Sequence, residues 1–444
     1  MRSCIRGTFV ALCAAVLCVG ARPAPLFKED ERSKIVAFWN VPGRYEHGTP
    51  VDPASPWQVR LTPDGSAWFL AYQKALNGAG KTPPTQDAAA TSTNADWEDW
   101  VKAKLVHDRW VASQTADAAN AARENRSGSA AQYPPAAPGP MPLGLVVAAG
   151  NAPVFSEPCS PLKYKVVFAD DETFEYKDHV TFRERFAYYR FPQGTVAYGS
   201  ALSDMTDAEL TPLFSTGMTP SESRIARAVS KLEGGFETVN TYDTGYVSIG
   251  FIQFITASDG KGSLAQVLAY EKKYFIVDFL IEFHRFGIDV NDDGEIVVLD
   301  PSTGGEISGA TAVMKIIEDK RLTAVFQRNG RHSRAFRSSQ IAIAKRIYWP
   351  ADLPVTVTVN GAEITGVVSD VVKSEAGMAT LFDRKVNRGN ILPFPDVVAQ
   401  VMTKHKLKTL AAAALYERDI IAQMKYRTDF LQDPTLSQPA PPPE

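Results

Sequence analysis

The sequence has few cysteines, no excess of positive charge and no zinc-binding motif. Of its 444 residues only four are cysteines, and three of these, Cys4, Cys13 and Cys18, lie within residues 1–21. Without that segment only Cys159 remains, so no internal disulfide staples the fold. With 47 basic against 50 acidic residues, the chain has no net positive charge to attract nucleic acid. We therefore expect a fold stabilised by its hydrophobic core and no nucleic-acid partner.

Zinc-site patterns are absent too. The six histidines are scattered and form no HExxH motif or paired spacing, which argues against a zinc hydrolase. The remaining metal candidate is a loop with calcium-ligand spacing. Its last position is an aspartate rather than a glutamate, and a strand pattern follows it, so a β-turn between two strands is the favoured interpretation. The residues of this calcium-loop candidate are Asp289, Asn291, Asp293 and Asp300.

Residues 1–21 have the pattern of a secretory signal. Arg2 and Arg6 precede a short apolar run, and Gly20-Ala21 offers a small-residue cleavage site. An uncleaved anchor is the alternative. No later apolar run reaches the length that spans a bilayer. The pattern predicts an exported protein, periplasmic or extracellular, with no membrane span after signal removal.

Changes of composition along the chain predict an α+β fold made of several units. Six of the seven tryptophans precede an Ala/Pro-rich stretch. Short strand patterns follow this stretch, and the apolar residues of the remaining chain recur mostly with helical periodicity. The predicted units are a signal peptide at 1–21, a Trp-rich helical region at 22–112, a linker at 113–143, a small β module at 144–205, a mostly helical domain with a small β-hairpin at 206–432, and a disordered tail at 433–444.

One helix in the last large unit ends on a carboxylate. Ile225, Val229 and Leu232 form an apolar stripe with Ala228, and Gly234-Gly235 stops the helix directly after Glu233. The negative end of the helix dipole and partial burial both disfavour an ionised carboxylate at that place. We therefore expect a raised pKa for Glu233, which suits a general acid at neutral pH.

A second carboxylate follows in an extended segment. Residues 241–250 have the turn residues and the alternation of a short hairpin, and Asp243 lies near its tip, where we expect better solvation than at Glu233. Two carboxylates in different surroundings are the pair that glycosidic bond cleavage requires. Ser248 is placed to hold the attacking water.

These residues carry a resemblance. Glu233-Gly234, the Tyr242–Tyr246 turn (Tyr-Asp-Thr-Gly-Tyr) and Ser248-Ile249-Gly250 resemble the catalytic segment of phage-type lysozymes, and Gly250-Phe-Ile-Gln253-Phe resembles an element of lytic transglycosylases. Chitosanases of the same superfamily share the helix-end Glu and the hairpin Asp. The segment departs from the lysozyme pattern in its Glu-to-Asp spacing, which is one residue longer, and in lacking the later His. The match covers about 30 residues and identifies the chain as a divergent member of the lysozyme-like superfamily.

The resemblance implies a glycan-cleaving enzyme that needs no cofactor, a muramidase or a lytic transglycosylase acting on peptidoglycan or a related amino-sugar polymer. Glu233 is then the acid, Asp243 the second carboxylate and Ser248 the residue in the Thr position. A late helix often closes the far side of the cleft in such enzymes. The substrate-binding candidates are Tyr242, Tyr246, Gln253, Asp383 and Asn387.

The alternative is a non-catalytic cell-envelope binding or scaffold protein that keeps the lysozyme-like fold. The N-terminal tryptophans and the linker fit such a partner-docking role. Ion pairing of Glu233 away from any cleft would favour this alternative.

Overall fold

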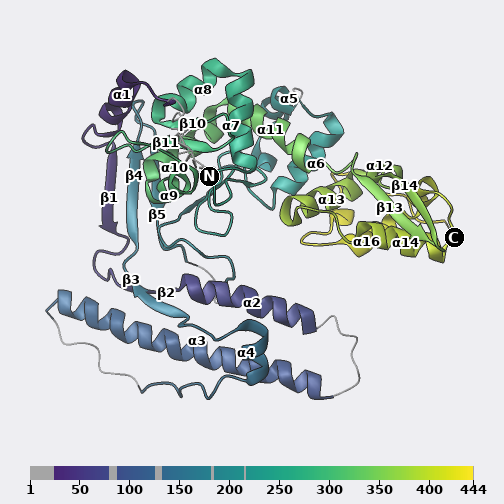
Figure 1. Ribbon diagram of the computed structural model, residues 1–444, viewed down its shortest axis with the longest axis horizontal. Helices are drawn as coiled ribbons and strands as arrows, with labels where there is room; N and C mark the ends of the chain where they lie inside the picture. Colours follow the sequence, from purple (N-terminus) through teal and green to yellow (C-terminus); the bar gives the residue numbers. More distant parts are fainter. Residues whose placement is uncertain (1–24, 80–87, 126–132, 182–184, 215–216, 444) are drawn as a thin grey trace, which may run out of the picture.

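The computed structural model describes residues 25–79, 88–125, 133–181, 185–214 and 217–443 (Figure 1). The predicted signal peptide lies outside these residues. Helices predominate in the described part, and its strands form five small antiparallel sheets, which confirms the predicted α+β class. No helix among the described residues combines the length and the apolar character needed to cross a membrane.

The Trp-rich region contributes to two separate cores. Trp39 at the end of α1 is buried, and its Nε1 donates to the Phe286 carbonyl at 3.0 Å, which ties α1 to the main body. Trp68 and Trp97 belong instead to a smaller cluster with Phe155. This cluster joins the helices of the lower layer in Figure 1. The elements of the region are α1 (Glu29–Trp39), β1 (Tyr45–Pro50), β2 (Gln58–Leu61), α2 (Pro63–Ala79) and α3 (Ala88–Arg123), and α3 continues into the first part of the predicted linker. Helix α4 (Leu143–Ala149) follows at the other end of that linker.

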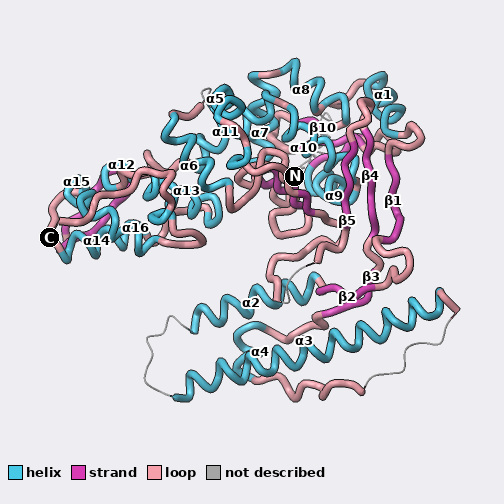
Figure 2. Tube along the Cα trace, turned by 180° about the vertical axis from the view of Figure 1, so that it is seen from behind, coloured by secondary structure: helices cyan, strands magenta, loops and turns pink. Residues whose placement is uncertain are grey.

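The strands of residues 144–205 do not pair only among themselves. β3 pairs with β2, β4 lies between β1 and β5, and β6 pairs with β7 further along the chain. Each strand is too short to bury an apolar face alone, so it is completed by a distant segment. Figure 2 shows the β1-β4-β5 sheet standing above the long helix α3. The bounds are β3 (Ser156–Cys159), β4 (Leu162–Val167), β5 (Thr173–Lys177) and β6 (Val196–Ala197).

The central body is helical. The helical periodicity of residues 263–286 and 311–328 predicts one long helix in each range, and each of these helices is broken. Phe275 leaves the helical region with φ −134° and ψ 48°, and Asp319 caps a new helix by accepting from the Arg321 amide at 3.2 Å. The bounds are η1 (Leu202–Asp204), α5 (Asp207–Phe214), α6 (Pro220–Ser230), β7 (Val239–Asn240), β8 (Ser248–Ile249), β9 (Phe254–Ile255), α7 (Ser263–Tyr274), α8 (Ile276–Glu282), η2 (His284–Phe286), β10 (Ile288–Val290), β11 (Ile296–Leu299), β12 (Glu306–Ser308), α9 (Gly309–Glu318), α10 (Lys320–His332) and α11 (Arg334–Tyr348).

The C-terminal part extends to one side of the body (Figure 1) and begins with a hairpin. Asn360 and Gly361 both have positive φ, as their turn sequence predicts. The bounds are β13 (Pro354–Val359), β14 (Ala362–Val367), α12 (Val368–Val371), α13 (Glu375–Arg388), α14 (Phe394–Lys404), α15 (Leu410–Ala413), η3 (Ala414–Tyr416), α16 (Glu417–Met424) and η4 (Phe430–Gln432).

The chain after residue 432 differs from the expected disordered tail. Leu436 is buried, the Ser437 amide donates to Glu375 Oε2 at 2.9 Å, and Gln438 Nε2 donates to the Asp433 carbonyl at 2.8 Å. Composition predicts disorder here, but one apolar side chain and a few polar contacts fix the segment against α13.

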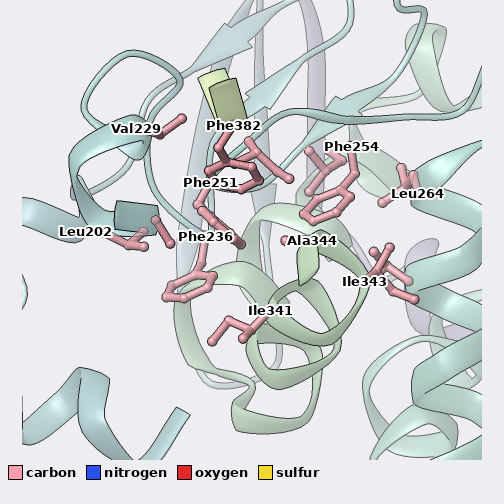
Figure 3. Close-up of a cluster of buried hydrophobic side chains, with 14 of the residues drawn as sticks. Leu202, Val229, Phe236, Phe251, Phe254, Leu264, Ile341, Ile343, Ala344 and Phe382 are labelled. Atoms are coloured by element: carbon pink, nitrogen blue, oxygen red, sulfur yellow. The ribbon is translucent and has the colours of Figure 1, made fainter. Parts of the chain in front are cut away.

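One continuous hydrophobic core packs α6, whose end carries Glu233, against the neighbouring elements. Val229 of α6, Phe236, Phe251, Ile341 of α11 and Phe382 of α13 come together in it (Figure 3). Because α6 and α13 pack against each other, the end of α6 is brought to the side of the late helix.

Candidate functional site

Glu233 lies in the turn that ends α6. The helix begins at the Thr219 cap, whose hydroxyl accepts from the Glu222 amide at 3.3 Å, and its regular part ends at Ser230. The Glu233 amide then donates to the Ser230 carbonyl at 3.0 Å, and the Gly234 amide donates to the same carbonyl. The glycine stop predicted from the sequence therefore places Glu233 at the negative end of the helix.

The two glycines after Glu233 are needed for close packing. Gly234 has φ +114°, and a Cβ on it would lie 2.2 Å from Thr238 Oγ1. A Cβ on Gly235 would lie 1.8 Å from the Ser200 carbonyl oxygen. The chain can turn from α6 toward β7 only because both positions lack a side chain.

The Glu233 carboxylate belongs to a cluster with three residues from the C-terminal part. Its Oε1 accepts from Arg427 Nη2 at 2.6 Å and from Asn387 Nδ2 at 3.1 Å. Asp383 Oδ1 accepts from the same two groups, at 3.1 Å from Asn387. We call Glu233, Asp383, Asn387 and Arg427 the carboxylate cluster. It joins the helix-end Glu to Asp383 and Asn387, which the sequence flagged separately.

Burial is the largest influence on the pKa of Glu233 within this cluster. The Glu233 side chain is 12% exposed, and burial raises its pKa above the ordinary value. Arg427 and the Asn387 amide oppose this rise, and the nearby charge of Asp383 adds to it. The net direction is upward because the effect of burial outweighs that of the guanidinium and the amide.

Asp243 lies in the turn after β7, paired with Tyr189 through an isolated bridge. Its Oδ1 accepts from the Gly245 amide at 2.8 Å, and its Oδ2 accepts from Asn240 Nδ2 at 2.7 Å. Burial raises its pKa, and the two hydrogen bonds oppose that rise. The sequence predicts better solvation for Asp243 than for Glu233, but both residues are half-buried, and burial raises the pKa of each carboxyl.

Ser248 lies beside Asp243, as the sequence predicts. A Cβ on Gly245 would lie 2.6 Å from Ser248 Oγ and 3.1 Å from Asp243 Oδ1, so both oxygens border the same small space. Ser248 is buried on β8. The hairpin therefore gathers one carboxylate and one hydroxyl around a glycine.

The three other candidates of this segment are Tyr242, Tyr246 and Gln253, and their side chains contact neighbouring rings or the backbone of the same segment. Tyr242 is buried, with Phe186 as a ring neighbour at 6.0 Å between centroids, and Tyr246 has φ +64° with its ring against Phe191. Gln253 has φ +56°, and its Nε2 donates to the Gly250 carbonyl at 3.0 Å. In the described part of the chain, neither Tyr246 nor Gln253 forms a hydrogen bond with the carboxylate cluster.

The calcium-loop candidates are not brought together. Asp289 is buried and bound by Lys272 Nζ at 2.7 Å and by His284 Nδ1 at 2.6 Å, while Asp300 pairs with Lys315 at 3.0 Å. Asn291 accepts from the Gly294 and Glu295 amides in the β10–β11 turn, and Asp293 is exposed. The favoured β-turn interpretation is confirmed. In the described part of the chain, no group of three acidic, histidine or cysteine residues is arranged to hold a metal.

Sequence reasoning missed two residues that organise the site. Arg427 completes the carboxylate cluster from a segment without a motif. Gln340 of α11 is fully buried, accepts from the Phe251 amide at 3.4 Å and donates to the Phe236 carbonyl at 3.1 Å. The one sequence signal that could have identified Gln340 is its position within an apolar helical stripe. Both roles depend on partners far away in the sequence.

Comparison of the chain with protein-family models, with curated proteins and with solved structures finds no match.

Proposed function

We propose that the protein cleaves glycosidic bonds in peptidoglycan or a related amino-sugar polymer, as an exported muramidase or lytic transglycosylase with Glu233 as general acid. The observation that carries the proposal is the upward pKa of Glu233 at the end of α6, where a second carboxylate and a hydroxyl follow in the next hairpin. A raised pKa favours the protonated form of Glu233, which is the form that can donate a proton to a leaving oxygen.

Each of the three residues has a role in the proposed reaction. Protonated Glu233 donates its proton to the glycosidic oxygen as the bond to the anomeric carbon breaks. In a hydrolase, Asp243 takes a proton from the attacking water or stabilises the positive charge on the sugar, and Ser248 orients the water. In a transglycosylase, a hydroxyl of the same sugar attacks the anomeric carbon in place of water, ionised Glu233 takes the proton of that hydroxyl, and an anhydro end forms without Asp243.

Arg427 supports the acid by dividing its charge between two carboxylates. Asp383 is the more buried of the two, with its side chain 2% exposed, against 12% for Glu233. A buried carboxylate depends on its ion partner more strongly than an exposed one. We assign the guanidinium mainly to Asp383, which leaves Glu233 free to accept and release a proton.

The test is incubation of the mature chain, residues 22–444, with purified peptidoglycan sacculi and mass analysis of the released fragments. Wild type should release fragments, and Glu233→Gln should not. Glu363→Gln, an exposed glutamate of β14, is the matched control and should behave as wild type. No release by wild type from sacculi or chitosan would overturn the proposal. Reducing ends would indicate hydrolysis, and anhydro ends would indicate the transglycosylase reaction.

The second candidate is a non-catalytic envelope-binding protein, and one observation favours it. The Arg427–Glu233 ion pair at 2.6 Å occupies the carboxylate that the reaction needs. Binding of wild type and Glu233→Gln to sacculi with equal affinity, and without release, would support this candidate.

A further inference from the structure

Helix α8 presents aliphatic side chains to solvent at the outer edge of the body. Figure 1 and Figure 2 both place this helix at the top of the molecule. Four of its seven residues are aliphatic and between 44% and 65% exposed. We call these four residues the α8 patch: Ile276, Val277, Leu280 and Ile281. A contiguous group of this kind differs from the single exposed aliphatic residues of an ordinary surface and indicates an interaction site.

The polarity of α8 is the reverse of that of an ordinary surface helix, which turns its apolar side to the core and its charges to water. At the spacing of an α-helix, the side chains of the α8 patch cover one arc of about 140°. The one buried residue of the helix, Phe279, lies outside this arc. Glu282 also lies outside it and faces inward, where its carboxylate accepts from the Ser333 hydroxyl. The aliphatic side of α8 therefore faces outward, where the core gains nothing from it.

The ends of α8 carry side chains that are typical of a lipid interface. Tyr274 precedes the helix and is 57% exposed, and Lys273 Nζ lies 5.0 Å from the centre of its ring. Arg285 follows the helix and is exposed as well. Tyrosine rings and the long stems of lysine and arginine settle at the level of lipid headgroups, where an apolar medium meets water.

The exposed charges around α8 favour negative headgroups. Within residues 273–285 the exposed charged residues are Lys273, Asp278 and Arg285. The two cations lie at the two ends of the helix, while Asp278 lies on the side of Glu282, outside the arc of the α8 patch. Cations that flank an apolar helix face are attracted to a surface of anionic lipids.

The size of the α8 patch fits a bilayer better than a second copy of the chain. Four side chains that are about half exposed offer on the order of a few hundred Å² of apolar surface. A stable dimer buries about 800 Å² on each partner and needs a surface of complementary shape. A bilayer has no fixed shape, so a small projecting group of aliphatic side chains can enter it one side chain at a time.

We propose that α8 docks the protein on a lipid bilayer with anionic headgroups, with the α8 patch inserted at the level where the acyl chains begin. The helix then lies in the plane of the interface, because its seven residues span only about 10 Å. Lys273 and Arg285 contact the headgroups at its two ends. This inference does not depend on the proposed glycan cleavage, which uses other residues.

The test measures binding of the mature chain, residues 22–444, to sucrose-loaded vesicles of phosphatidylglycerol and phosphatidylethanolamine. Wild type should sediment with the vesicles, and the double variant Val277→Gln/Ile281→Gln should bind at least about tenfold more weakly. Glutamine is a better helix former than valine or isoleucine, so the variant should keep its fold, which thermal unfolding checks. Vesicles of phosphatidylcholine alone should bind wild type at least about tenfold more weakly than the anionic vesicles.

Helix α4 offers a matched control. Leu143 and Val147 are 83% and 89% exposed and have the same spacing as Val277 and Ile281, but they lie in the lower layer of Figure 1. Leu143→Gln/Val147→Gln should therefore bind vesicles as wild type does. Insertion is measured with an environment-sensitive dye on Val277→Cys, since Cys159 is buried. Its emission should shift to the blue when vesicles are added, and the same dye on Val147→Cys should show no shift.

The inference would be overturned if wild type did not bind the anionic vesicles, or if both double variants bound them equally well. Equal binding to phosphatidylcholine would contradict the assignment of anionic headgroups. A dimer of wild type in light scattering that Val277→Gln/Ile281→Gln converts to monomer would assign the α8 patch to a second copy instead. None of these results bears on glycan cleavage, whose own test uses Glu233→Gln.

Discussion

Arg427 Nη2 donates to Glu233 Oε1 at 2.6 Å, across 194 residues of sequence. The same nitrogen contacts Asp383, so the charge of one guanidinium is divided between a candidate acid and a buried carboxylate. Burial raises the pKa of Glu233 more than the shared guanidinium lowers it, so the net direction is upward. Among the groups that lower this pKa, Arg427 acts most strongly.

Replacement of Arg427 should move the pH dependence of the reaction upward. The guanidinium lowers the pKa of Glu233, so Arg427→Met raises that pKa further and shifts the alkaline limit of activity to higher pH. The variant should also lose about 1–3 kcal/mol of stability, because Asp383 keeps its burial without its cation. The measurements are pH–rate profiles on sacculi and denaturant unfolding. Arg427→Lys, which keeps the charge, should show a smaller shift; an unchanged alkaline limit in Arg427→Met would contradict the assignment of Glu233.

Asp243→Asn should separate the two possible reactions. A hydrolase should lose release by about 100-fold or more, because the second carboxylate handles the water or the developing positive charge. A transglycosylase should keep most of its activity and form anhydro ends. Asn240→Ala is the control, since it removes the hydrogen bond to Oδ2 and keeps the carboxylate. Equal losses in both variants would mean that the hydrogen bond, rather than the charge, carries the effect.

Two glycines with positive φ should respond differently to alanine. Gly294 has φ +75° and no atom near its missing Cβ, so Gly294→Ala should cost about 1 kcal/mol from backbone strain alone. Gly234→Ala adds an overlap with Thr238 Oγ1, and we expect a cost of about 3 kcal/mol or more. Urea unfolding measures both. Similar costs would show that the turn after Glu233 can relax.

Glu271 should make the stability of the protein depend on pH. It is fully buried, and burial, followed by the neighbouring Glu282 and Asp278, raises its pKa to about 10. The folded chain therefore keeps a proton that the unfolded chain releases above about pH 4.3. Its contribution to stability is complete below that pH and declines as the pH rises toward 10, by at most about 1.4 kcal/mol per pH unit.

The variant Glu271→Gln tests this directly, since glutamine does not ionise. It should match wild type near pH 4 and unfold at a higher denaturant concentration near pH 8. Glu363→Gln on the exposed face of β14 should show no such difference. Parallel pH dependences for wild type and Glu271→Gln would contradict the raised pKa.

Local structure followed closely from local sequence. Asn360-Gly361 predicts the β13–β14 turn because both residues tolerate positive φ, and Gly234-Gly235 predicts the end of α6. The mixed α+β class follows from the two hydrophobic periods. The breaks at Phe275 and Asp319 were missed because an apolar helical period continues through them, although a cap at Asp319 starts a new helix.

By itself, then, the sequence determined the mixed α+β class, the end of α6 beside Glu233 and the β13–β14 turn, because hydrogen bonds within a few residues govern such local features. Only the tertiary structure decided that Asp383, Asn387 and Arg427 surround Glu233, and that burial raises the pKa of Asp243. The physical reason is that packing of α6 against α13, and the degree of burial it produces, depend on residues far apart in the chain, about which a local pattern carries no information.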